Sequence, residues 1–290
     1  MNAEDDTDAD GAGGAGDAGH DAVRPAAAAI GGRPTGPYDF EGRVALVTGA
    51  GRGIGAATAR LLAARGARVA VNYHRSAERA REVVESIARE GGRAIALPGD
   101  VTDADQVAEL VSGAAAALGP VDVLVLNASG LGAHEAAIAP ATELAWEDLE
   151  RVVVQQLKAL FLTARAVLPG MIARGSGSVV AVGAALARRP APRFLPLSVA
   201  KAGVKAAVRT LALEAGPHGV RVNAVEPNLI LTELARHVPE PQRRAAAERA
   251  ALRRNGTPQD IAEVIAFLAS ERAAYLTGGC LLADGGTAFA

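Results

Sequence analysis

Aromatic residues are scarce in this sequence: they make up 3% of its 290 residues, although 50% are hydrophobic. A core built from this composition must be aliphatic, made of alanine, valine and leucine. The single cysteine, Cys280, cannot form an internal disulfide, and no Cys/His cluster has the spacing of metal ligands. We therefore expect neither a disulfide framework nor a metal site, and this cysteine usage fits a reducing cytoplasm.

An excess of one charge and long apolar runs are also missing. The formal net charge is -2, and no basic stripe stands out. This argues against nucleic-acid binding, which depends on neutralising phosphates. No apolar run approaches the ~20 residues of a membrane span. The acidic N-terminus is unlike the basic start of a secretory signal. We expect a cytoplasmic protein that contacts neither nucleic acid nor membrane.

The first part of the chain differs from the rest. Residues 1–36 are rich in Asp, Ala, Gly and Pro and nearly lack large apolar side chains. Such a segment cannot bury enough surface to offset the entropy lost on ordering, so we predict a disordered tail. The remainder, residues 37–290, is long enough for one large α/β domain and short for two.

From Phe40 onward, short apolar strands alternate with helical segments. Strands are expected at 44–48, 68–73, 93–97, 121–126, 178–182, 221–225 and 280–283. Helices are expected at 54–65, 76–90, 103–118, 146–173, 198–215 and 257–270. Strands separated by helices of about 12 residues or more predict parallel pairing through helical crossovers. The expected fold is a doubly wound, Rossmann-type sheet, whose ligands bind beyond the carboxyl ends of the strands.

A glycine-rich turn, TGAGRGIG at 48–55, follows the first strand and leads into a helix. Gly49 permits the tight turn, Gly53 lets the backbone approach a pyrophosphate, and Gly55 lets the helix pack close to the sheet. The helix that begins near Ile54 offers unpaired N–H groups to a phosphate. Because the strand and the helix flank the turn on both sides, we predict dinucleotide binding rather than a plain glycine loop.

The end of the second strand indicates which dinucleotide binds. It reads Tyr73-His74-Arg75-Ser76, without the acidic residue that would hold the ribose hydroxyls of NAD. Arg52 in the glycine turn and Arg75, with the Ser76 hydroxyl, can bind a 2′-phosphate. The sequence therefore predicts NADPH as the cofactor. The alternative is that Arg75 is a solvated surface residue.

Further motifs follow in order along the chain: GDVTD at 99–103, DVLVLNAS at 122–129, RVNAVEPNLILT at 221–232 and YLTGGCLLADGG at 275–286. Together with the glycine turn, they make residues 40–290 resemble the short-chain dehydrogenase/reductase family, most closely its ketoacyl-carrier-protein-reductase-like branch. The resemblance implies an oxidoreductase that pairs through its long helices into a homodimer or homotetramer. It also implies a short substrate lid at 233–254, an Arg-rich segment that we expect to form a solvated amphipathic helix.

The resemblance implies cofactor contacts at the strand ends, from the adenine to the nicotinamide: Asp100, Val101, Asn127, Ile230, Thr232 and Lys201. The first two would flank the adenine. Ile230 and Thr232 would hold the nicotinamide carboxamide, and Lys201 would bind the ribose hydroxyls.

The chain departs from the family at the reaction centre. The family pattern is Tyr-x-x-x-Lys, with a Ser thirteen positions before the Tyr and an Asn on the long helix. Lys201 matches the lysine, but the three other positions hold Leu197, Ala184 and Gln156. In this family the phenol of the Tyr protonates the carbonyl oxygen and the Ser supports it. A positioned acid contributes about 10²–10⁴-fold, and neither Leu197 nor Ala184 can supply one.

Two functions remain open. The first is an NADPH-dependent ketoreductase whose substrate, an aromatic polyketide, activates its own ketone through a neighbouring hydroxyl. Water, Ser198 or Ser129 would complete protonation, and an apolar pocket around Leu197 and Ala184 suits a flat polycyclic ligand. The chain resembles an atypical angucyclinone ketoreductase of this family, which implies a role in antibiotic biosynthesis. The second function is a non-catalytic NADP-binding pseudoenzyme, a redox sensor or assembly partner. Retention of Lys201 favours the enzyme.

Overall fold

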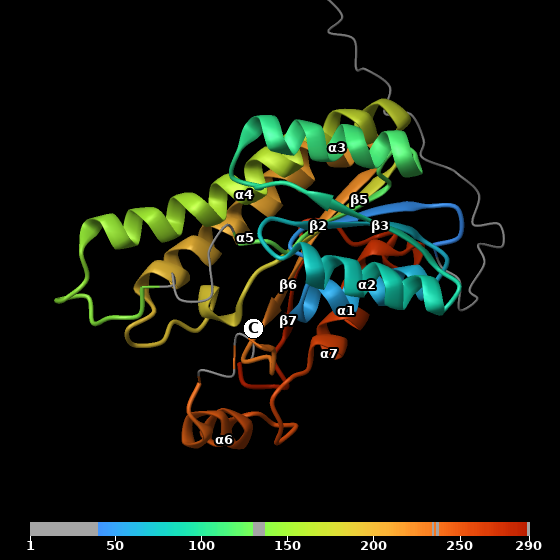
Figure 1. Ribbon diagram of the computed structural model, residues 1–290. Helices are drawn as coiled ribbons and strands as arrows, with labels where there is room; N and C mark the ends of the chain where they lie inside the picture. The colour runs from blue at the N-terminus through green and yellow to red at the C-terminus, as the bar shows by residue number, and fades with distance from the viewer. Residues whose placement is uncertain (1–39, 130–136, 234, 236–237, 289–290) are drawn as a thin grey trace, which may run out of the picture. The chain divides into compact units, whose positions relative to one another are not determined.

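The computed structural model describes residues 40–129, 137–233, 235 and 238–288. The predicted tail, residues 1–36, lies outside the described residues. In the described part, seven strands form one sheet in the order β3-β2-β1-β4-β5-β6-β7, and all neighbours pair in parallel (Figure 1). The doubly wound α/β fold that the strand and helix pattern predicts is therefore confirmed.

Each strand lies close to its predicted position. The strands are β1 (Val44–Val47), β2 (Arg68–Tyr73), β3 (Arg93–Pro98), β4 (Val123–Leu126), β5 (Gly177–Val182), β6 (Val220–Pro227) and β7 (Cys280–Ala283). The chain builds outward from β1 to β3, then returns to place β4 on the other side of β1. This reversal of strand order leaves a crevice at the carboxyl ends of β1 and β4, where ligands bind in such sheets.

Helices cover both faces of the sheet (Figure 1). They are α1 (Gly53–Ala64), α2 (Ala77–Arg89), α3 (Ala104–Leu118), α4 (Trp146–Arg174), α5 (Leu195–Ala215), α6 (Glu240–Arg249) and α7 (Pro258–Ala269). The first, second and last pack on one face, while α3, α4 and α5 pack on the other. Helix α6 lies beyond the ends of β6 and β7 (Figure 1).

The core is aliphatic on both sides of the sheet. Side chains alternate along each strand, so Leu46 and Leu124 face α3–α5 while Val47 and Val125 face α1, α2 and α7. All four are fully buried. Strands buried on both faces read as continuous apolar runs, which is why the sequence revealed them.

Two helical segments differ from the sequence expectation. Helix α5 begins at Leu195 rather than Ser198, because Pro196 fits the first turn of a helix, where its missing N–H is not needed. Among the described residues of the expected lid, 233–254, the α-helix is α6, which starts where prolines occupy its N-cap and first turn. The expectation of one amphipathic helix over the whole lid was therefore wrong in extent.

Helix α4 is long and apolar enough, by length and composition alone, to cross a membrane. The sequence analysis looked for unbroken apolar runs and therefore did not predict that this helix would be apolar enough. However, 44% of its most apolar window is buried inside the protein, and Leu160 and Met171 belong to the core on the α3–α5 face. These contacts are those of a core helix.

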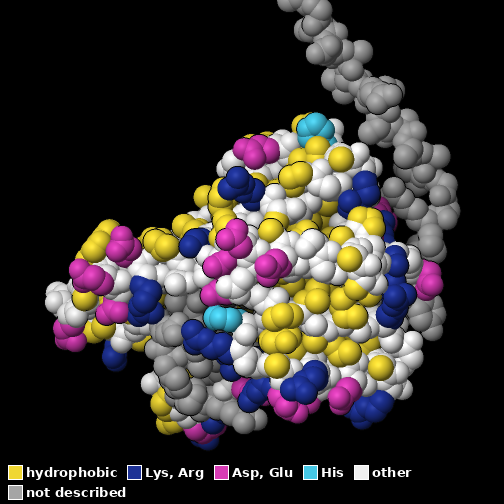
Figure 2. Space-filling view, turned by 45° about the horizontal axis from the view of Figure 1, so that its top comes forward, with side chains coloured by type: hydrophobic (Ala, Val, Ile, Leu, Met, Phe, Trp, Pro, Cys, Tyr) yellow, Lys and Arg dark blue, Asp and Glu magenta, His cyan; other side chains and the backbone are white. Residues whose placement is uncertain are grey.

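Basic and acidic side chains are interspersed on the face that Figure 2 shows. Among the described side chains in that view, no continuous basic stripe is visible. The phosphate backbone of a nucleic acid would meet charges of both signs there.

Candidate functional site

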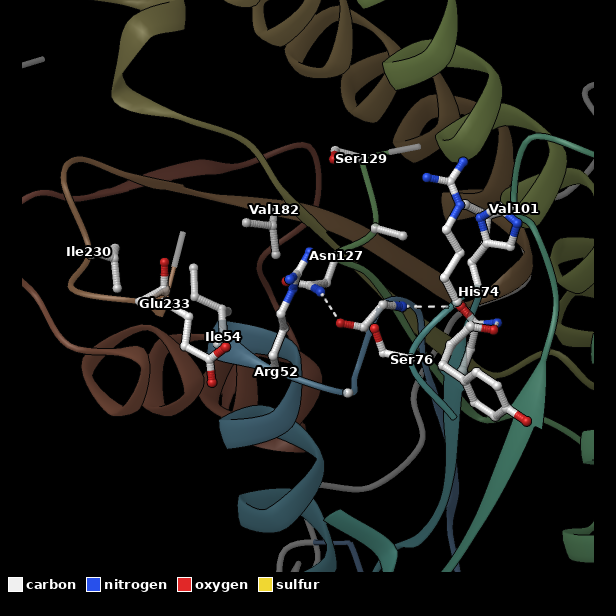
Figure 3. Close-up of a pocket in the computed structure, with 18 of the residues that line it drawn as sticks. Arg52, Ile54, His74, Ser76, Val101, Asn127, Ser129, Val182, Ile230 and Glu233 are labelled. Atoms are coloured by element: carbon white, nitrogen blue, oxygen red, sulfur yellow. Dashed lines mark hydrogen bonds between the residues drawn. The ribbon is translucent and has the colours of Figure 1, made fainter. Parts of the chain in front are cut away.

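A cavity of about 630 Å³ opens at the carboxyl ends of the strands, around the crevice between β1 and β4 (Figure 3). It brings together most of the predicted cofactor residues: Gly49, Arg52, Gly53, Ile54, Tyr73, His74, Arg75, Ser76, Asp100, Val101, Asn127, Ile230 and Thr232. Ala184 also lines it. The remaining predicted residues, Gly55, Gln156, Leu197 and Lys201, are not part of its lining.

The glycine turn has the geometry that its sequence requires. Gly49 and Gly53 have φ of +62° and +55°, a region that favours glycine. A Cβ on Gly55 would lie 2.6 Å from the carbonyl oxygen of Gly49 and from Nδ2 of Asn127. Gly55 therefore lies behind the cavity wall and permits α1 to approach the turn closely.

Two polar residues that sequence reasoning missed hold this turn in place. Asn72, which is 1% exposed, accepts a hydrogen bond from the N–H of Gly49 at 3.1 Å and donates to the carbonyl of Gly99 at 3.0 Å. The Thr48 hydroxyl accepts hydrogen bonds from the backbone N–H groups of Asn127 and Ala128, both at 3.0 Å. Both are polar residues at the end of an apolar strand, and this position was the sequence feature from which their role could have been inferred.

The N-terminus of α1 faces the cavity without a side-chain cap. Arg52 occupies the N-cap position and makes no capping hydrogen bond, and the first turn holds no acidic residue. Gly53 and Ile54 line the cavity. Unpaired N–H groups and the positive end of the helix dipole suit a phosphate, so the turn fits the pyrophosphate of a dinucleotide.

Basic groups gather at one end of the cavity. Figure 3 shows His74 and Val101 on one side and Ile230 on the other. Nε2 of His74 lies 3.7 Å from the carboxylate of Asp100. Burial by itself raises the pKa of Asp100. Hydrogen bonds from Thr102 and the charges of His74 and Arg75 lower the pKa by more than burial raises it, so the net pKa is below the ordinary value. Asp100 thus stays ionised at this end of the cavity.

Lys201 reaches the opposite end from behind the cavity wall. Its Nζ donates a hydrogen bond of 3.0 Å to the carbonyl of Val182, which lines the cavity. Burial lowers the pKa of its ammonium to about 8. Leu197 lies one turn earlier on α5. With Ala184 in the cavity wall, neither position offers a proton donor.

Three further polar residues of the sequence prediction differ in their access to the cavity. Gln156 is 5% exposed within α4 and lies outside the cavity lining. Ser198 is buried, and its hydroxyl has no hydrogen-bond partner among the described residues, but it does not line the cavity either. Ser129 does line it, at the end of β4.

The depressed pKa of Lys201 predicts opposite pH effects on binding and on stability. The sequence predicts that this ammonium donates hydrogen bonds to the ribose hydroxyls. It loses its charge above pH 8, so NADPH affinity should fall about fivefold between roughly pH 7 and 9. The folded-state pKa lies below the ordinary value of 10.5, so the unfolded chain binds more protons in this window and stability rises with pH. Fluorescence titration and thermal melts measure both.

The matched control for this pH effect is Lys201→Arg, because a guanidinium keeps its charge over the whole range. Its NADPH affinity should be flat with pH. A wild-type affinity that does not change between these pH values would contradict the assignment of Lys201 to the ribose.

Comparisons with known proteins identify the family. Residues 49–288 match the family model described as Enoyl-(Acyl carrier protein) reductase. The structure of a short-chain type dehydrogenase/reductase from Mycobacterium marinum matches with a TM-score of 0.80 and 30% identity, covering 87% of this chain and 98% of that chain. This chain belongs to the short-chain dehydrogenase/reductase family.

Curated relatives in this family are oxidoreductases. Cis-4-hydroxycyclohexanecarboxylate dehydrogenase of Sinomonas cyclohexanicum is 41% identical over 247 residues, 85% of this chain and 97% of that protein. A 3-oxoacyl-(acyl-carrier-protein) reductase of Staphylococcus epidermidis is 35% identical over 242 residues, 83% of this chain and 97% of that protein. Short-chain dehydrogenases/reductases bind a nicotinamide cofactor and act on small molecules, and the cavity lies where their fold places that cofactor.

Proposed function

We propose that this short-chain dehydrogenase/reductase is an NADPH-dependent ketoreductase that reduces a ketone on a polycyclic aromatic polyketide, similar to an angucyclinone, in antibiotic biosynthesis. One observation carries the proposal: Ala184 lies in the wall of the cofactor cavity, Leu197 lies one turn before Lys201 on α5, and neither side chain offers an acid. The sequence resembles the ketoreductase of simocyclinone biosynthesis, a member of the family without its tyrosine and serine.

Different residues of the chain bind different parts of the cofactor. The glycine turn and the N-terminus of α1 bind the pyrophosphate, while Arg52, Arg75 and Ser76 bind the 2′-phosphate. Lys201, fixed by the carbonyl of Val182, orients the nicotinamide ribose. When bound, NADPH supplies the hydride that reduces the carbonyl carbon. Positioning of this kind contributes a large share of the rate even without an acid.

The carbonyl oxygen is satisfied by the substrate in this proposal. A phenolic or enolic hydroxyl beside the ketone donates a hydrogen bond to the developing alkoxide. A water molecule then gives the alkoxide the proton that makes it an alcohol and leaves as hydroxide. The wall around this end includes Val182, Ala184, Pro227 and Ile230. These apolar groups suit a flat aromatic ring and provide a low local dielectric, which strengthens the internal hydrogen bond.

A non-catalytic NADP-binding protein, acting as a redox sensor or assembly partner, is the second candidate. The missing acid favours it, whereas the fixed position of Lys201 favours the enzyme, because a sensor has no need to orient the nicotinamide. Under both proposals the protein is cytoplasmic. It pairs as a homodimer or homotetramer through α4 and α5, where Val154, Phe161 and Val199 expose 43–55% of their surface.

Restoring the family's missing groups tests this proposal. We expect the Leu197→Tyr/Ala184→Ser protein to reduce an angucyclinone with a peri-hydroxyl within about tenfold of the wild-type kcat, because the substrate already stabilises its alkoxide. The measurement is NADPH consumption with chromatographic detection of the alcohol. Leu197→Phe is the control for ring size without a hydroxyl. A gain of about 10²-fold or more in the double variant would reject substrate assistance, and no turnover by the wild-type protein would favour the sensor.

A further inference from the structure

An ion pair joins α2 to the beginning of the lid. The guanidinium of Arg79 in α2 donates a hydrogen bond to the carboxylate of Glu233, which directly follows Thr232. The hydrogen bond and the charge of Glu233 raise the pKa of Arg79 above its ordinary value. The two residues are 154 positions apart in the sequence, so the pair connects segments that the chain itself does not hold together.

Arg79 and Thr232, the residue before Glu233, lie directly against the glycine turn. A Cβ on Gly53 would lie 3.3 Å from Cγ2 of Thr232, and a Cβ on Gly51 would lie 3.7 Å from Cβ of Arg79. Glu233 lines the cofactor cavity and also a second recess of about 660 Å³ on the outer side of the turn. Arg79 lines that recess. The ion pair therefore crosses the outside of the turn that holds the pyrophosphate.

We propose that Arg79 and Glu233 form a strap that holds the first residues of the lid against the glycine turn and slows the release of the phosphate-bearing cofactor. Arg79 is a positioning residue that acts through Glu233. With the pair intact, Thr232 stays packed on Gly53 and closes one side of the cavity. When the pair breaks, Thr232 and Glu233 are held less firmly against the turn and the cofactor leaves sooner.

The sign of one substitution separates this strap from a simple charge effect. The carboxylate of Glu233 lines a cavity that accepts phosphates, so by charge alone it repels the cofactor. If charge were its only influence, Glu233→Gln would tighten NADPH binding. The strap requires the opposite, because Glu233→Gln removes the ion pair with Arg79 and leaves only a weaker hydrogen bond from the guanidinium to a neutral amide oxygen.

The size of the effect follows from exposure. The side chains of Arg79 and Glu233 are 42% and 41% exposed, and ion pairs at such positions are screened by solvent. We expect the NADPH dissociation rate to rise about twofold to fivefold when the pair is broken, with no loss of folding.

The test is the release of NADPH from the binary complex, followed by stopped-flow fluorescence after mixing with excess NADP⁺. Arg79→Ala, Glu233→Gln and the double variant should all release NADPH faster and to a similar extent, since each breaks the same contact. Arg79→Lys should retain most of the effect of the pair. Arg81→Ala is the matched control, because Arg81 lies on the same helix, pairs locally with Glu78 and lines neither cavity.

Slower release from Glu233→Gln, or unchanged release from both single variants, would overturn the strap, as would additive effects in the double variant. Hydrogen exchange at the backbone amides of Leu231 and Thr232, which bond to Gly256 and Ile230, gives a second readout that should increase in the same variants. No ketone is present, so the result stands whether or not the protein proves to be a polyketide ketoreductase.

Discussion

Replacing Arg75 with Glu should lower the preference for NADPH over NADH by about 10-fold to 150-fold. Arg75 lines the cavity beside Arg52 and Ser76, and a hydrogen bond to a charged phosphate contributes about 1.5–3 kcal/mol. A carboxylate at this position would repel the 2′-phosphate and accept hydrogen bonds from the free hydroxyls of NADH. Fluorescence titrations with both cofactors measure the change.

The control for this experiment is Arg81→Glu, which makes the same change of charge on an exposed side chain of α2 that lies outside the cavity lining. It should leave the preference unchanged within about twofold. An equal loss of affinity for NADPH and NADH in Arg75→Glu would mean that the charge of Arg75 attracts both cofactors at long range and does not contact the 2′-phosphate. No loss at all would support a solvated surface residue.

Gly55→Ala should damage both the fold and the cofactor site. The added Cβ would lie 2.6 Å from the Gly49 carbonyl oxygen and 2.9 Å from Cα of Ala50. Both are backbone atoms, so the glycine turn must shift to make room. Overpacking of this kind costs about 1–3 kcal/mol of unfolding free energy. Because the displaced turn is also the pyrophosphate site, NADPH affinity should fall by more than about tenfold.

Denaturant unfolding and NADPH titration check this prediction separately. Gly216→Ala is the matched control, since a Cβ there meets nothing within 4 Å and the backbone has φ of -57°. Its stability should stay within about 0.5 kcal/mol of the wild type. If Gly55→Ala bound NADPH as well as the wild type, the close approach of α1 to the turn would not matter for the cofactor.

Much of the fold could be predicted because parallel strands are buried on both faces. Runs such as Val123–Leu126 are short and continuously apolar, as expected for strands buried on both faces, and helical segments separate them. Boundaries were less predictable. Helix α5, for example, begins at Leu195 rather than at the expected Ser198 and holds Pro196 in its first turn. The Arg-rich segment at 233–254 was expected to form an amphipathic helix, and among its described residues the α-helix covers Glu240–Arg249.

The cofactor residues could be placed together from the sequence because each follows a strand, and the ends of parallel strands meet at one edge of the sheet. Asn72, Thr48 and Glu233 could not be assigned roles, because these depend on partners far away in the chain. Glu233, for example, meets Arg79 on α2. That Lys201 reaches the site from behind Val182 was equally invisible. The roles of the individual site residues stay predictions.

The decisive measurement is the transfer of deuterium from NADPH labelled at C4 to a hydroxy-substituted angucyclinone ketone by the unmodified protein. We predict an alcohol with one deuterium on the carbinol carbon, formed while Leu197 and Ala184 are in place. Tight NADPH binding with no deuterated alcohol would contradict a ketoreductase that leaves the carbonyl oxygen to its substrate.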